Sequence, residues 1–181
     1  MEENVLVTLR KWNRWIAIGA GIVLLGCAII VLLDIFLRRV GSSFGGTDEI
    51  SGYVMAIATA WGMAFTLLEL GHVRIDVMRA RSGQTGRSVF DLVAMTMMAV
   101  TVTLIAIRCW PVLSRSIINS SRSNTPLEIP LILVQTPWFL GWVWFAFVSW
   151  VTLICATSMV LRGNFESSEA AIGCFGEKEP T

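Results

Sequence analysis

Four long apolar segments divide the chain, and most polar residues lie between them. The segments are residues 15–37, 50–68, 89–107 and 138–161. An α-helix rises about 1.5 Å per residue, so about 20 apolar residues cross the roughly 30 Å hydrocarbon core of a bilayer. Each segment is apolar on every face, and the sequence lacks the alternating ten-residue strands of a membrane barrel. The pattern predicts an all-α integral membrane protein with four transmembrane helices and short interfacial amphipathic helices.

The composition agrees with a membrane protein. Of the 181 residues, 55% are hydrophobic and 15% are charged, against roughly 45–50% and about 25% in soluble domains. The net charge of +1 provides no broad basic surface, so a nucleic-acid partner is disfavoured. We expect one membrane domain at residues 15–161. Residues 1–14 form an N-terminal segment, and the polar tail at residues 162–181 is expected to be disordered.

The distribution of positive charge predicts the orientation. Nine of the 14 Lys and Arg residues lie at the two termini or between the second and third apolar segments. The remaining five lie in the other two connections. Positively charged connections favour the cytoplasmic side of a membrane. Both termini are therefore expected to be cytoplasmic.

The sequence offers little material for a cofactor or metal site. His72 is the single histidine, and the four cysteines are far apart in the sequence. Structural zinc takes four protein ligands and catalytic zinc takes three, while disulfide-exchange chemistry favours a Cys-x-x-Cys pair. We therefore assign no catalytic, cofactor-binding or metal-ligating residue. A four-span membrane redox enzyme or cofactor anchor is the alternative function, and the same observations argue against it.

Charged residues near the ends of the first two segments have local explanations. Asp34 lies four residues before Arg38, the spacing at which two side chains face each other on a helix, which predicts an ion pair. Thr47 is expected to cap the second helix, with Asp48 and Glu49 in its first turn near the positive end of the helix dipole. Coupling-ion binding by these two carboxylates is the less favoured interpretation.

A row of small residues follows one side of the second segment. Gly52, Ala56, Ala60 and Ala64 recur every fourth position. Small residues allow close approach of another helix inside a membrane. The row fits packing within this chain and packing against a partner equally well.

The remaining connections predict short surface helices. Gly71 is expected to end the second helix, and residues 75–81 have an amphipathic pattern. Pro111 is expected to open a separate short helix along the outer surface. Residues 125–128 read Thr-Pro-Leu-Glu, which predicts a helix start with a capping box, followed by a kink at Pro137.

Taken together, these connections resemble the small membrane subunit, DctQ, of tripartite ATP-independent periplasmic (TRAP) transporters. The similar features are Asp34 with Arg38, Asp48 with Glu49, Gly62, the Gly-His-Val-Arg-Ile-Asp at 71–76, and the Pro-Leu-Glu-Ile-Pro at 126–130. The resemblance implies a small permease subunit in the bacterial inner membrane that is not an enzyme. Its implied partners are a large permease subunit, which carries the transport path and the sodium sites, and a periplasmic substrate-binding protein.

The resemblance further implies secondary active uptake of an organic acid by symport, with the small subunit bracing the large one. The substrate class stays open among C4-dicarboxylates, sialic acids, sugar acids and ectoine-like solutes. We expect assembly or lipid contacts, and no catalysis, at eleven positions: Asp34, Arg38, Asp48, Glu49, Gly52, Ala56, Ala60, Ala64, His72, Arg74 and Asp76.

Overall fold

A computed structural model describes residues 2–42, 44–72, 79, 81–125 and 127–173. Within these ranges the regular elements are five helices: α1 (Glu2–Arg39), α2 (Thr47–Leu68), α4 (Gln84–Ile118), α5 (Leu131–Leu161) and α6 (Phe165–Ile172). The described residues form no strand beyond one isolated bridge between Arg122 and Pro130. Four helices are long and apolar enough to cross a membrane. The predicted all-α class with four spans is confirmed.

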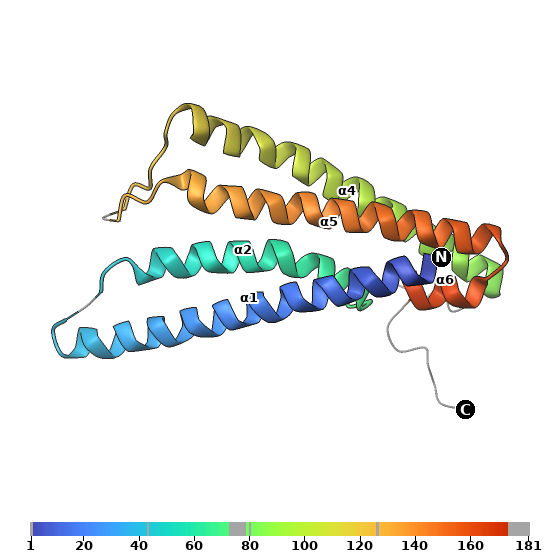
Figure 1. Ribbon diagram of the computed structural model, residues 1–181, viewed down its shortest axis with the longest axis horizontal. Helices are drawn as coiled ribbons and strands as arrows, with labels where there is room; N and C mark the ends of the chain where they lie inside the picture. Colours follow the sequence, from blue (N-terminus) through green and yellow to red (C-terminus); the bar gives the residue numbers. More distant parts are fainter. Residues whose placement is uncertain (1, 43, 73–78, 80, 126, 174–181) are drawn as a thin grey trace.

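The helices form two antiparallel hairpins that lie side by side (Figure 1). One hairpin is α1 with α2, the other is α4 with α5, and α2 packs against α5 between them. The short helix α6 folds back against α4 and α5. We call the end of the bundle that holds α6 and the N-terminus the terminal end. The opposite end, which holds the α1–α2 and α4–α5 connections, is the loop end.

The core is centred on α5. Val148 and Ala156 of α5 are fully buried, as are Met95 and Ala99 of α4, and these residues belong to one apolar cluster. Their spacing of four and eight residues places them on one helix face in each case. In contrast, no residue in the most apolar stretch of α1 is buried. The first span therefore lies at the edge of the molecule.

Hydrogen bonds from indole N–H groups join neighbouring helices. A buried tryptophan N–H needs an acceptor, because an unpaired polar group away from water is costly. The observed donors and acceptors are Trp61 Nε1 to the Pro137 carbonyl at 2.9 Å, Trp144 Nε1 to Asn13 Oδ1 at 3.1 Å, and Trp150 Nε1 to Thr103 Oγ1 at 2.9 Å.

Helix α1 begins well before the predicted span. Residues 2–14 continue the helix and bury Leu6, Leu9 and Asn13. Glu2 accepts a hydrogen bond from the Ser158 hydroxyl of α5 at 2.8 Å. The sequence predicted only the stretch that lipid requires to be apolar, whereas contacts with α5 stabilise the polar extension as well.

One prediction about a proline needs correction. Pro111 does not open a separate surface helix, because α4 continues through it to Ile118. Proline removes one backbone donor from a helix, and the burial of Leu113 and Ser116 in the following turn holds the helix together. Pro137 lies inside α5, which begins at Leu131, and the kink expected there stays a prediction.

The prediction of a disordered tail is wrong for Phe165–Ile172, which form α6. The Asn164 side chain caps this helix by accepting a hydrogen bond from the Ser167 backbone N–H at 3.4 Å. Ala171 and Ile172 are buried in the core cluster. With only eight residues, α6 is too short to give a strong periodic signal in the sequence, and packing stabilises it. Residues 174–181 lie outside the described part of the chain, as does most of the predicted 75–81 helix.

Candidate assembly surface

Asp34 is the centre of a polar network at the loop end. Its side chain is only 1% exposed. It accepts hydrogen bonds from the Phe44 backbone N–H at 2.8 Å, the Thr47 hydroxyl at 2.8 Å and the Arg38 Nε at 3.1 Å. The predicted ion pair between Asp34 and Arg38 is thus confirmed, with 3.0 Å between Nη2 and Oδ2. The buried carboxylate joins the end of α1 to the start of α2.

The same network corrects the prediction for Thr47. Its hydroxyl donates to Asp34 and does not cap α2. The N-cap position belongs to Gly46, which has φ of 72° and contributes no side-chain cap. Positive φ favours glycine because a Cβ would be strained there. Asp48 and Glu49 do occupy the first turn of α2, as expected.

Glu49 connects α2 to the α4–α5 connection. Its carboxylate accepts hydrogen bonds from the Tyr53 hydroxyl at 2.6 Å and from the Thr125 hydroxyl. The hydroxyls of Thr125 and Ser123 are 2.6 Å apart and extend this network. Asp48, in contrast, is 83% exposed and lies 3.4 Å from Arg38. Of the two adjacent carboxylates, Glu49 holds the two hairpins together at the loop end.

Thr125 and Glu128 do not form the predicted capping box. The Thr125 hydroxyl contacts Glu49, and Glu128 has φ of 44°, which is outside the helical region. The segment is a turn, and α5 begins at Leu131 after Pro130. The long-range contact with Glu49 prevails over the local capping pattern.

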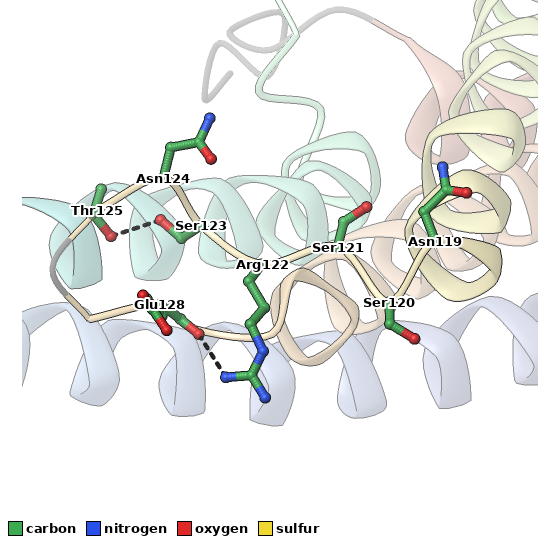
Figure 2. A pocket seen from close by; sticks show the side chains of 8 residues that line it. All are labelled: Asn119, Ser120, Ser121, Arg122, Ser123, Asn124, Thr125 and Glu128. Atoms are coloured by element: carbon green, nitrogen blue, oxygen red, sulfur yellow. Dashed lines mark hydrogen bonds between the residues drawn. The ribbon is translucent and has the colours of Figure 1, made fainter.

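The α4–α5 connection forms an open polar hollow of about 580 Å³, shown in Figure 2. Arg122 donates to the Glu128 carbonyl at 3.3 Å across it. The lining consists of hydroxyl, amide and charged side chains: Asn119, Ser120, Ser121, Arg122, Ser123, Asn124, Thr125 and Glu128. Among the described residues, no group of three His, Cys, Asp or Glu side chains is arranged to hold a metal ion. The lining is suited to polar contacts.

The row of small residues on α2 is divided between two environments. Ala60 and Ala64 are buried. A Cβ added to Gly141 of α5 would lie 2.8 Å from the Ala60 Cβ, so the two helices are in close contact there. Gly52 and Ala56 are exposed, and nothing lies within 4 Å of a Cβ added at Gly52. The half of the row toward the terminal end packs within this chain, and the half toward the loop end is uncovered.

His72 lies at the other end of α2 from the Asp34 and Glu49 networks. Its ring stacks on Phe145 of α5, with 6.0 Å between centroids and 16° between planes. The structure therefore does not bring all the predicted residues into one site. Arg74 and Asp76 lie outside the described residues.

A buried charge network at the terminal end was not predicted from the sequence. Arg79 Nε and Asp91 Oδ1 are 2.8 Å apart, and both side chains are almost completely buried. Arg79 Nη2 also lies 2.7 Å from Glu169 of α6. Asp91 was the one charge inside the third apolar segment, and this isolated carboxylate was the available signal.

The two hairpins and the polar networks at their ends define a small multi-pass membrane protein. Its sequence matches, over residues 27–159, the family described as "Tripartite ATP-independent periplasmic transporters, DctQ component". The match covers more than half of the chain, so this protein belongs to the DctQ family. Comparisons with curated proteins and with solved structures give no significant match. The protein is therefore a small permease component of a TRAP transporter in the inner membrane.

Proposed function

We propose that this chain is a non-catalytic subunit that binds and braces the large permease subunit during uptake of an organic anion by ion symport. A periplasmic binding protein delivers the anion, and the coupling sodium ions bind in the large subunit. The observation that carries the proposal is the exposure of the first span. None of the residues in its most apolar stretch is buried within this chain, so the stretch is open to an external partner.

The uncovered half of the small-residue row supports a protein partner beside the lipid. Gly52 and Ala56 leave the α2 backbone accessible from outside. Small residues favour contact with another helix, because they let the two backbones approach and pack closely. The large subunit is expected to place a helix against this part of α2.

The position of the charges supports bracing over transport by this chain. Helix α5, the most central helix, contains no charged residue. Asp34 and Asp91 lie near the ends of their spans and are engaged by arginines. A solute or ion path through a membrane protein usually places ionisable groups or broken helices near mid-membrane. We also propose that both termini lie on the cytoplasmic side, as the distribution of positive charge predicts.

Copurification tests this proposal. The double variant Gly52→Leu with Ala56→Leu adds bulk to the uncovered half of the row. We expect it to reduce recovery of the large subunit at least severalfold, with unchanged helical content by circular dichroism. Val93→Leu with Val100→Leu enlarges two exposed side chains on α4 and serves as the control. Equal recovery with both double variants would show that this face of α2 does not bind the large subunit.

Uptake by cells tests the wider role. Deletion of this chain is expected to abolish uptake of the organic anion, and the unmodified chain is expected to restore it. Uptake that continues in the deletion strain would contradict the bracing role. Transport by this chain alone in liposomes would contradict its assignment as a helper subunit.

A further inference from the structure

Two hydrogen bonds show which residues of different helices lie at the same level along the bundle. Trp144 of α5 donates to Asn13 of α1, and Trp150 of α5 donates to Thr103 of α4. Because α4 runs antiparallel to α5, moving six residues from Trp150 to Trp144 corresponds to moving six residues from Thr103 to Cys109. Asn13 and Cys109 therefore lie at the same level, within about one helical turn.

The sequence places these two positions at opposite membrane surfaces. Trp12 and Arg14 lie just before the apolar segment of α1, whereas Arg108 and Trp110 lie just after the apolar segment of α4. Tryptophan and arginine at such positions mark the interface between membrane and water. At this one level of the bundle, α1 enters the hydrocarbon from one side and α4 leaves it on the other.

Exposed apolar side chains lie on both hairpins. From this level toward the loop end, α1 exposes apolar residues such as Leu25 (65%) and Ile29. Toward the terminal end, the other hairpin exposes Met97 of α4 and Ile154 of α5 (64%), and α1 exposes Val7 (63%). Figure 1 shows the corresponding displacement, with the α1–α2 hairpin shifted toward the loop end.

We infer that this protein lies obliquely in the bilayer, with a mean helix tilt of about 40–50° from the membrane normal. The middle of the α1 apolar segment is about 13 residues from Asn13, and the middle of the α4 segment is about 11 residues from Cys109 in the opposite direction. These offsets add to about 36 Å along the bundle. Three helix spacings of about 10 Å separate the outermost helices. Both middles reach the centre of the bilayer only when the bundle is tilted by this amount.

Three of the four long helices have the length for this orientation, whereas α2 has 22 residues. Crossing a hydrocarbon core of about 30 Å at 45° takes about 28 residues, against about 20 for an upright helix. Helices α1, α4 and α5 have 38, 35 and 31 residues. Transmembrane helices are tilted by about 20° on average and rarely beyond 40°. The inference rests on membrane insertion and does not require the large subunit, so copurification results leave it unchanged.

Spin-label depth measurements on the full-length chain in phosphatidylcholine vesicles test the orientation. The native cysteines are replaced by alanine, and single labels are attached through Leu25→Cys, Ile154→Cys, Trp12→Cys and Trp110→Cys. An oblique bundle places the labels at 25 and 154 deep in the hydrocarbon, with high accessibility to oxygen and low accessibility to a water-soluble nickel complex. Positions 12 and 110 then lie at opposite surfaces, which an impermeant thiol reagent distinguishes on the unlabelled cysteine variants.

An upright bundle gives the reverse pattern. Positions 25 and 154 are about 22 residues apart in level, or roughly 33 Å, so both labels cannot be deep. The labels at 12 and 110 would then share one depth. This result would overturn the inference.

Polarised infrared spectroscopy of the unmodified chain in aligned bilayers provides a second test that needs no substitution. We expect a mean helix tilt of about 40–50°. A mean tilt near the usual value of about 20° would overturn the inference.

Discussion

Replacing Asp34 by alanine removes the acceptor that three groups share at the loop end. The Phe44 N–H and the Thr47 hydroxyl each donate to this carboxylate at 2.8 Å, and Thr47 is itself buried. Hydrogen bonds to a charged group contribute about 1.5–3 kcal/mol each, and a buried donor left unpaired costs about 1–3 kcal/mol. Water at the loop end can satisfy part of this loss. We therefore expect Asp34→Ala to lower the free energy of unfolding by about 2–4 kcal/mol.

Unfolding in detergent micelles, followed by circular dichroism, measures this change. Asp48→Ala is the matched control, because Asp48 also contacts Arg38 but is 83% exposed, and exposed ion pairs add little stability. Asp34→Asn retains one acceptor oxygen without the charge, so its loss should fall between the two. Equal stability of Asp34→Ala and Asp48→Ala would refute the assignment of Asp34 as the residue that fixes the α1–α2 connection.

Three further predictions concern the contacts between helices. Arg79→Ala removes the arginine that pairs with the buried Asp91 and with Glu169 of α6, so it should cost about 3–5 kcal/mol and increase hydrogen exchange in α6; normal protection of α6 would contradict this. Gly141→Ala should cost about 1–3 kcal/mol in detergent unfolding, because its Cβ would collide with α2, whereas Gly52→Ala should be neutral or slightly stabilising. Trp144→Phe removes one hydrogen bond to α1 and should cost about 1 kcal/mol, with the loss visible as greater exchange at residues 2–14.

The spans could be predicted because lipid imposes a simple requirement. A helix that crosses the hydrocarbon must be apolar over about 20 residues, and this requirement can be read along the sequence. The ion pair between Asp34 and Arg38 was also predictable, because both residues lie on one helix at a fixed spacing. Local geometry was sufficient in these cases.

Other features depend on contacts that no local pattern records. Thr125 and Glu49 are 76 positions apart in the sequence, yet their contact prevails over a favourable capping pattern. Helix α6 is stabilised by packing against α4 and α5 and by the contact of Glu169 with Arg79. Pro111 predicted the start of a helix, whereas buried neighbours in the next turn keep α4 continuous. In each case tertiary contacts outweighed a local preference.

We propose above that this chain functions as the partner of a large TRAP permease subunit. Native mass spectrometry of the tagged chain, extracted from its own membrane in mild detergent, tests this claim most directly. We expect a complex that contains one copy of this chain and one much larger polytopic permease subunit. Recovery of the chain only as a monomer or as assemblies of itself, under conditions that keep other membrane complexes intact, would contradict the account.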